Sequence, residues 1–582
     1  MPATGMQPTA GLTTREYTAT AGTTWSGGGL LATYKDSSAD PIYADQRDYT
    51  EPLFDPKTLY PGMDLHSGLL SAHQSLGDIV ELRLEALRTH REQSYFSGTS
   101  ATYFHYVPET TTSLVSPSFE VSLPRDWTLS VGGTWSKDDT DNKSLRATGV
   151  PTSGVSYFNE SRLYDANAEG PLFALGGGDA RLAVGAGYRT NDYLVLDSTT
   201  RIVNVEGDDS SRFVYAELNL PLIGPDSNVA GAHQLALTAA VRGEDYDSFG
   251  KVTTPKLGVV YGPGNDFTLK ASWGKSFKVP TLLQQNSTQQ AYLLPMSFVG
   301  GTGYAADATL LMTYGGNSNL DPERARTWTA SLNFHPESLP GLEAELTWFD
   351  IDYTDRVVIP VVTVTQALSN PIYAEFVDYS PTAEQQAGIL ASASQFSSFT
   401  SAAYDPSKVV AILFNQYLNA TSQQVRGLDL SGSYGFDFGH GRLTIRGSAS
   451  RLDSSQQTTS AQRAYDLSGT LFNPARLNGR LGAVWSRAGL TVSTFANYTG
   501  GVTDTVAAEK NASFTTFDAT LRYANAGRGS VWSGLEFSLS AQNVFNRAPP
   551  LYVNASIFNV PYDSTNYSAI GRFLSVSISK HW

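Results

Sequence analysis

The eight histidines are the first residues to test for catalysis or metal binding, and their spacing supports neither role. They are scattered from His66 to His581, without an H-E-x-x-H motif or a pair four residues apart. Cysteine is absent, which excludes a disulfide scaffold, a zinc ribbon, an iron–sulfur centre and a thiol nucleophile. There is no strand-to-helix Gly-x-Ser-x-Gly elbow and no Walker-type phosphate loop. We therefore expect no catalytic residue, no metal site and no cofactor.

Two weaker signals concern ligand binding. The run Asp138-Asp139-Thr140-Asp141 has the oxygen ligands that calcium prefers, but the pattern favours a solvated loop tip over a calcium site. Aromatic side chains gather in two segments, 277–324 and 354–422, where rings could stack on a ligand at low entropic cost. Packing of these loops against themselves is the alternative. The candidate ligand contacts are Tyr292, Tyr304, Tyr314, Tyr373, Tyr379 and Tyr404.

Composition narrows the class of protein. The chain of 582 residues has a net charge of −15 and is 16% charged and 11% aromatic. An acidic chain of this kind is not expected to bind nucleic acid. No apolar run approaches the ~18 residues of a transmembrane helix. The first residues, MPATGMQPTAGLTTREY, lack the basic and apolar regions of a signal peptide.

The dominant pattern is strict alternation of apolar and polar residues. In 80–86, valine, leucine and alanine alternate with Glu81, Arg83 and Glu85, and 535–542 repeats the pattern with serine and glutamine. Each such segment is a strand with one apolar face. A soluble sandwich or propeller and a membrane barrel both fit this alternation. The segments average about 11–12 residues, which suits tilted membrane-spanning strands of ~9–11 better than globular strands of ~5–6.

The sequence thus predicts an all-β, transmembrane antiparallel β-barrel of about 21–22 strands. The predicted strands are 15–25, 28–36, 64–75, 78–90, 113–123, 127–137, 154–167, 179–190, 211–220, 233–246, 251–261, 267–276, 325–335, 341–353, 423–435, 441–452, 476–486, 489–500, 513–524, 534–544 and 571–582. The connections alternate between short, about 6 residues, and long, about 27, with 247–250 the exception; bacterial outer-membrane barrels alternate short periplasmic turns with long extracellular loops.

The same pattern assigns faces and loop structure. Leu82, Leu218, Leu237, Leu521 and Phe537 are expected to face lipid. The inner wall is expected to present Glu81, Arg83, Glu85, Arg442 and Arg446, either toward a ligand path or in cross-strand pairs. Prolines before 384–395 and 407–418 predict two short helices in the second aromatic segment.

Strand direction leads to one further expectation. Successive strands of an antiparallel barrel alternate in direction. If the last strand runs toward the periplasm, the strand at 15–25 runs the same way, because the number of predicted strands between them is odd. Single-chain bacterial barrels normally have an even number of strands. We therefore expect a strand to be missing before residue 15, a short irregular segment at 1–14, and a barrel over 15–582.

Four motifs, in order along the chain, resemble those of the TonB-dependent receptors. Trp273 to Leu282, with Phe277 and Pro280, resembles the family's G-x-F-K/R-A-P-T/S-L. Gly316 to Glu323, with Asn317, Asn319, Pro322 and Glu323, is similar to its G-N-P-N-L-x-P-E. The strand around Gly427 and the pair Asn543 and Phe545 resemble two later family motifs, and the terminal Trp582 resembles the signal by which the barrel-assembly machinery recognises outer-membrane proteins.

The resemblance implies an outer-membrane transporter for a scarce nutrient, without bond chemistry and in contact with outer-membrane lipid. It covers only the barrel of that family: we recognise no plug domain and no TonB box, so coupling to TonB is expected only if an upstream segment supplies them. A passive porin-like channel and a truncated, non-functional fragment remain alternatives. An outer-membrane hydrolase would need a nucleophile–base pair that the sequence does not show. Siderophore, cobalamin, haem and oligosaccharide ligands are not distinguished.

Overall fold

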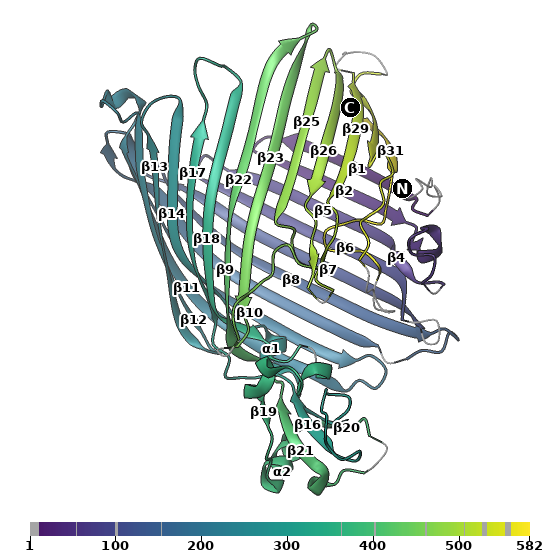
Figure 1. Ribbon diagram of the computed structural model, residues 1–582. Coiled ribbons are helices and arrows are strands. Elements are labelled where there is room, and N and C mark those ends of the chain that lie inside the picture. Colours follow the sequence, from purple (N-terminus) through teal and green to yellow (C-terminus); the bar gives the residue numbers. More distant parts are fainter. Residues whose placement is uncertain are drawn as a thin grey trace.

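In the computed structural model the chain is one large curved antiparallel sheet with a small module of loops at one end (Figure 1). The structure describes residues 11–53, 55–98, 103–152, 154–362, 364–400, 403–459, 462–505, 507–525, 532–552 and 560–582. The segment 1–14 that the sequence predicts to be irregular lies largely outside the described residues. The first strand of the structure begins at Thr14.

Twenty-one long strands form the wall, each antiparallel to the next along the chain, and all the strands expected from the sequence are confirmed. Among the described residues they are β1 (Thr14–Trp25), β2 (Gly28–Ala39), β5 (Gly62–Leu76), β6 (Val80–Gly98), β7 (Tyr103–Leu123), β8 (Trp127–Arg146), β9 (Val155–Leu175), β10 (Gly178–Asp197), β11 (Val203–Ile223), β12 (Gln234–Tyr246), β13 (Gly250–Gly262), β14 (Phe267–Lys278), β17 (Glu323–Phe334), β18 (Leu342–Val358), β22 (Leu418–Phe438), β23 (Gly441–Gln457), β25 (Leu477–Arg487), β26 (Leu490–Thr499), β29 (Phe514–Ala524), β30 (Leu535–Gln542) and β31 (Phe573–Lys580).

In the part of the chain that the structure describes, the sheet has two free edges. The two-residue β24 (Tyr465–Asp466) adds to the side of β23 and brings the sheet to 22 strands. Within the described residues β1 pairs only with β2, and β31 only with β30. The wall is therefore not closed by backbone hydrogen bonds between its first and last strands.

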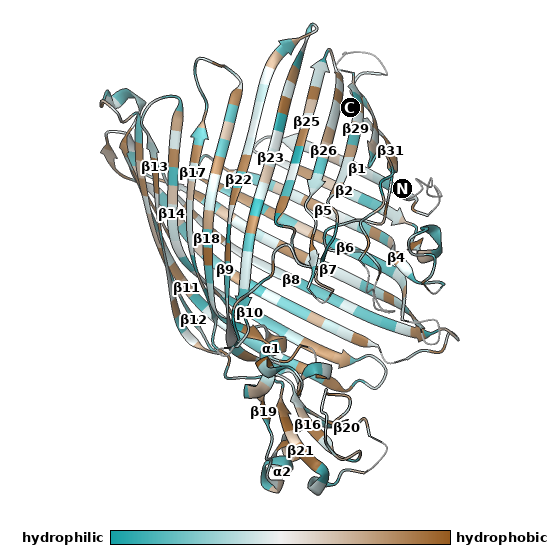
Figure 2. Ribbon diagram, in the orientation of Figure 1, coloured by the Kyte–Doolittle hydropathy of each residue, from teal (hydrophilic) through white to brown (hydrophobic). Residues whose placement is uncertain are grey.

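Hydrophobic and hydrophilic residues alternate along the wall strands (Figure 2), so the two faces of the wall differ in polarity. On the outer face Trp328, Leu332 and Leu430 are 47%, 37% and 52% exposed. On the inner face polar groups pair across strands: the Ser331 and Thr347 hydroxyls lie 2.8 Å apart, and Asn333 Nδ2 donates to Glu345 over 2.6 Å. An apolar exterior around a polar lumen is the arrangement of a transmembrane barrel. No helix in the described part of the chain is long and apolar enough to cross a membrane.

Several strands are longer than predicted at the end of the wall that carries the long loops, which we call the long-loop end. Strand β6 continues to Gly98 and β7 starts at Tyr103, so most of the predicted loop 91–112 is an extended hairpin. Strands β8, β10 and β11 extend in the same way. The sequence criterion was apolar alternation, which stops at the edge of the apolar band, whereas backbone pairing continues beyond it.

The described residues of segments 279–322 and 359–417 fold together into a loop module, seen below the wall in Figure 1. Its five-stranded sheet has the order β19-β21-β16-β15-β20. These strands and the module's long helix are β15 (Gln290–Pro295), β16 (Thr309–Tyr314), β19 (Val377–Asp378), β20 (Gln395–Ser398), β21 (Val409–Phe414) and α2 (Ala383–Ser392). The helix predicted at 384–395 is confirmed, and its N-cap Thr382 accepts the Gln385 N–H over 3.1 Å.

The helix predicted at 407–418 is wrong. Only Pro406–Lys408 forms a helical turn, and strand β21 follows it. The run Val409-Val410-Ala411-Ile412-Leu413 is rich in β-branched residues and pairs with β16, and that tertiary pairing outweighs the proline start signal. The remaining short elements are η1 (Ala44–Gln46), β3 (Ile42–Tyr43), β4 (Thr58–Tyr60), η2 (Pro225–Ser227), α1 (Leu282–Asn286), η3 (Val364–Gln366), η4 (Pro371–Phe376), η5 (Pro406–Lys408), β27 (Thr503–Asp504) and β28 (Glu509–Lys510).

Candidate ligand-binding surfaces of the mouth and lumen

The loop module has its own hydrophobic core, and some of the six candidate tyrosines are part of it. Leu310 and Leu413 are completely buried, and Tyr373 is only 8% exposed in the same cluster. A second cluster around Leu293 and Ile412 packs against α2. The module is thus a folded unit at the mouth, and the Tyr373 ring is committed to its interior.

Three further candidates are half-buried within the module. Tyr292 lies edge-on to Tyr314 at 6.4 Å between ring centroids and tilted to Phe399 at 5.9 Å. The Tyr404 hydroxyl donates to Gln386 Oε1 over 2.8 Å, and burial raises the pKa of Tyr404. These contacts are the self-packing that the sequence left open as the alternative.

Tyr304 and Tyr379 are different, because both stay on the module surface. They are 42% and 47% exposed. Partial burial raises the pKa of Tyr379, with a smaller contribution from the nearby Tyr304. Of the six candidate tyrosines, these two offer the most ring surface to a ligand outside the mouth.

The family-like motifs join the loop module to the wall. Asn317 Nδ2 donates to the Tyr417 carbonyl over 3.0 Å, and its Oδ1 accepts the Asn319 N–H over 2.9 Å. Glu323, 4% exposed, accepts the Val357 N–H over 3.1 Å and lies 3.4 Å from the Lys278 ammonium. These hydrogen bonds and the ion pair hold β14, β17 and β18 together where the loops leave the wall.

The other motif residues are structural as well. Phe277 lies edge-on to Tyr246 at 6.0 Å, and the buried Pro280 offers its carbonyl to Gln285 Nε2 over 2.8 Å. The neighbouring Pro322 is buried too. A Cβ at Gly427 would lie 2.6 Å from the Phe349 ring, so only glycine allows that ring to lie over the strand.

At the end of β30 the chain turns sharply, and two motif residues shape the turn. Asn543 adopts φ 45° and both accepts the Arg547 N–H and donates to the Arg547 carbonyl, each over 2.9 Å. Phe545 is 73% exposed and packs edge-on to Phe517 at 5.4 Å. Trp582 is fully exposed at the chain end.

The inner wall holds a charged hollow that the sequence only partly predicted. A cavity of about 530 Å³ runs along β17, β18, β22 and β23, bordered by Glu343, Glu345, Arg446 and Arg480. The guanidinium carbons of Arg446 and Arg480 lie 5.0 and 4.1 Å from the Phe495 ring centroid. Arg446 was predicted to face the lumen, whereas Arg480 and Phe495 were missed because the stacking needs the register of three strands.

Elsewhere the inner wall is largely self-paired. Arg83 lies 2.8 Å from Glu81 on its own strand and 3.9 Å from Glu120 on the neighbouring β7, and the second contact is the cross-strand pairing named above. On β12, Glu244 is buried between Arg242 at 2.6 Å and Arg189 at 3.5 Å. A second hollow of about 550 Å³ lies along β8 to β10 and includes residues 281–283 at the start of α1.

The acidic run does not converge on a point. Asp138 to Asp141 lie within β8 rather than at a loop tip, so consecutive side chains point to opposite faces. Asp138 accepts from the Thr112 hydroxyl over 2.6 Å, and Asp139 pairs with Lys137 at 2.7 Å. No group of three or more histidine or acidic side chains in the described part of the chain could hold a metal ion.

Comparison with known protein families decides the family. The model described as "TonB dependent receptor-like, beta-barrel" matches residues 13–546. The chain belongs to the TonB-dependent receptors.

Individual relatives of this receptor barrel carry siderophore-receptor names. The ferric enterobactin receptor PirA of Pseudomonas aeruginosa is 32% identical over 131 residues, 22% of this chain and 16% of that protein. The ferrienterobactin receptor of Escherichia coli is 27% identical over 165 residues, 28% of this chain and 21% of the relative. These alignments therefore span about a fifth or less of the curated relatives.

Solved structures agree on the fold across the whole chain. The siderophore receptor PirA from Acinetobacter baumannii superposes with a TM-score of 0.68 at 14% identity, covering 98% of this chain and 78% of that one. The outer membrane transporter YddB from Escherichia coli gives 0.65 at 10% identity, covering 98% and 75%. At these identities the likeness establishes the fold alone.

Proposed function

We propose that this chain is the barrel of an outer-membrane receptor that takes up a ferric siderophore or a similar small ligand, without enzymatic chemistry. The observation that carries the proposal is the family match over residues 13–546 on a wall with an apolar exterior and a polar lumen. The siderophore-receptor names of the relatives support the ligand class.

In this proposal the ligand first meets the loop module and then the lumen. Tyr304 and Tyr379 present aromatic surface at the mouth. Farther in, Arg446 and Arg480 offer positive charge that suits an anionic iron chelate, and the Phe495 ring holds both guanidinium groups in place. Energy coupling through TonB requires a plug and a TonB box.

The outer face and the last strand fit membrane insertion. Leu574, Val576 and Ile578 are 65%, 63% and 68% exposed on β31, in phase with the terminal Trp582. We infer that lipid covers this face and that the barrel-assembly machinery reads the strand.

The test is ligand binding by the purified 582-residue chain in detergent micelles. Tryptophan quenching by ferric enterobactin, ferrichrome and cobalamin is titrated for the wild type and a Tyr304→Ala/Tyr379→Ala double variant. We expect saturable binding of a ferric siderophore, weakened about tenfold in the double variant, since aromatic stacking contributes ~0.5–1.5 kcal/mol per ring.

Tyr465→Ala is the matched control, because Tyr465 is a 39% exposed tyrosine outside the loop module and should leave affinity unchanged. Absence of saturable binding for all three probes, together with a large unselective conductance in planar bilayers, would favour the passive channel instead.

A further inference from the structure

The outer face carries an apolar band with aromatic rings at both borders. On β14 and β17, Trp273 and Trp328 lie 6.1 Å apart at the border nearer the long-loop end, and Phe267 and Phe334 stack at 4.9 Å at the other. Aromatic girdles of this kind mark the two membrane interfaces of a transmembrane barrel. The residues just beyond the tryptophans therefore lie at the level of lipid headgroups.

Basic residues follow this tryptophan pair on the side of the long-loop end. Lys275 is opposite Arg326 in the ladder, one outward position beyond Trp273 and Trp328, and Arg324 is one position farther along β17. Arg324 and Arg326 are exposed, whereas Ala325 between them is 7% exposed, so both guanidinium groups are on the outer face.

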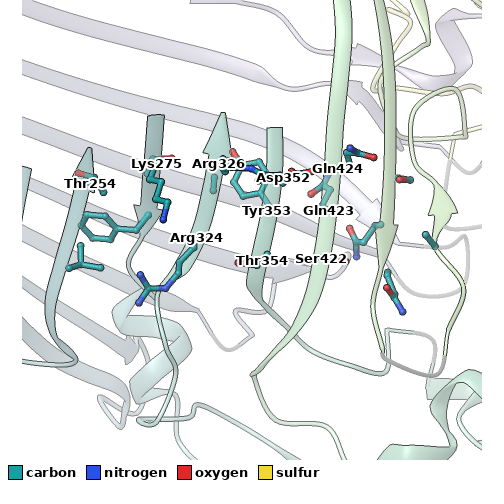
Figure 3. Close-up of a pocket in the computed structure, with 18 of the residues that line it drawn as sticks. Thr254, Lys275, Arg324, Arg326, Asp352, Tyr353, Thr354, Ser422, Gln423 and Gln424 are labelled. Carbon is teal, nitrogen blue, oxygen red and sulfur yellow. Dashed lines mark hydrogen bonds and ion pairs between the residues drawn. The ribbon is translucent and has the colours of Figure 1, made fainter. Parts of the chain in front are cut away.

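These side chains border a groove of about 670 Å³ across β13, β14, β17, β18, β22 and β23 (Figure 3). Each of these six strands contributes three consecutive residues to it. Because neighbouring side chains alternate faces, the flanking residues Lys275, Arg324, Arg326 and Asp352 form its outer walls, and the middle residues contribute its floor. By their register with Trp273 and Trp328, these four charged side chains point to the outside of the barrel rather than to the lumen.

The charge of the groove is unbalanced. It holds three cations and one carboxylate, Asp352, which contacts Arg326. Within the described residues neither Lys275 nor Arg324 has an ion-pair partner. This positive groove stands out on a chain whose net charge is −15.

The corresponding position on another part of the wall shows the contrast. On β8, Lys137 follows the outward-facing Trp135 just as Lys275 follows Trp273, but Lys137 pairs with Asp139 at 2.7 Å. On the adjacent β9, Arg162 pairs with Glu160. Outward charges are neutralised there, so proximity to the tryptophan girdle does not by itself create a positive groove.

We propose that this groove binds the phosphate groups of a glycolipid headgroup in the outer leaflet. The acyl chains of that lipid then lie on the apolar band, on the other side of the tryptophan pair. Guanidinium groups bind phosphate oxygens through two parallel hydrogen bonds, and lysine adds a point charge. Asp352 holds Arg326 in place, which leaves Lys275 and Arg324 to meet the lipid. The proposal rests on the outer-membrane location proposed above.

The test is lipid retention by the full chain, measured by native mass spectrometry from micelles supplied with bisphosphorylated lipid A, its dephosphorylated form or phosphatidylcholine. The wild type should retain the bisphosphorylated lipid at least tenfold more than either of the others. Lys275→Gln/Arg324→Gln should abolish this preference, and Lys137→Gln, the matched control, should keep it. Heat-modifiable electrophoretic mobility verifies that each variant is folded.

Three results would overturn the inference: equal retention by the wild type and the double variant, retention that is indifferent to dephosphorylation, or the same loss in Lys137→Gln. Millimolar inorganic phosphate should not displace the lipid, and displacement would show that a free anion is the true ligand. Quenching of the tryptophans by brominated lipid separates the two proposals. If quenching is absent the membrane location fails and this inference with it, whereas quenching without lipid preference refutes the groove alone.

Discussion

At the scale of single residues, the direction of a side chain decides what a substitution costs. Leu332 lies in the middle of the apolar band, and its neighbour Ser331 points into the lumen toward Thr347. We expect Leu332→Arg to lower the free energy of unfolding in bilayers by ~2–4 kcal/mol, because the guanidinium must enter hydrocarbon. Ser331→Arg, which places the same charge in water, should cost well under that.

Urea unfolding of both variants in lipid vesicles, followed by tryptophan fluorescence, measures the difference. Equal costs, or a larger cost for Ser331→Arg, would mean that the faces have been assigned the wrong way round.

Also at this scale, the sequence predicted which way side chains point but not which ones meet. Alternation along one strand places Arg446 on the inner face, and the structure agrees. The stacking of Arg446 and Arg480 on Phe495 depends on how β23, β25 and β26 are aligned. That alignment is set by the whole ladder, so no single strand contains the signal.

At the scale of elements, the two ends of the chain are joined by their loops. Arg47, between β2 and β5, is 4% exposed and donates to the Ala569 carbonyl over 2.8 Å and the Ile570 carbonyl over 2.9 Å. Beside it Tyr49 lies edge-on to Tyr562 at 5.9 Å, and burial raises the pKa of Tyr562 to about 12. This clasp links the loop after β2 to the loop before β31.

Arg47→Ala should therefore loosen the long-loop end. Removing the guanidinium leaves two carbonyls without their donor, at ~1.5–3 kcal/mol for each charge-assisted hydrogen bond. We expect faster proteolysis within 560–572 and a lower melting temperature, with Arg47→Lys intermediate. Arg463→Ala, which removes an exposed loop arginine, is the control, and unchanged proteolysis in Arg47→Ala would show that the clasp does not hold the loops.

Elements of the wall could be predicted far better than those of the loop module. Each wall strand repeats one pattern, so all 21 strands were found, with errors mainly where polar hairpins extend past the apolar band. In the module, β21 pairs in parallel with β16 about a hundred residues earlier in the chain. Local start signals for a helix at 407–418 carry no information about such a distant partner.

At the scale of the whole molecule, the two edge strands β1 and β31 determine how the barrel can close. Twenty antiparallel steps separate β1 from β31, so the two edge strands run parallel to each other. Every residue of β1 is exposed. Free N–H and C=O groups are costly in lipid, at several kcal/mol for each unsatisfied group. A single strand antiparallel to both edges would satisfy them and give the even count that single-chain bacterial barrels normally have.

The absence of cysteine makes this seam directly measurable. If the seam has room for one strand, β1 and β31 lie about 10 Å apart, twice the ~4.8 Å spacing of neighbours. Inward-facing cysteines in Thr20→Cys/Ser577→Cys should then form no disulfide, which needs Cα atoms within ~7 Å, but should be joined by a 10 Å bismaleimide. Thr20→Cys/Thr33→Cys, whose native hydroxyls lie 3.0 Å apart, should oxidise readily as the control. Because the register across the seam is not fixed by any pairing, Thr18→Cys and Ser575→Cys are tested in all combinations with the first pair. A high yield of direct disulfide in any combination would show that β1 and β31 pair in parallel and that no further strand is accommodated.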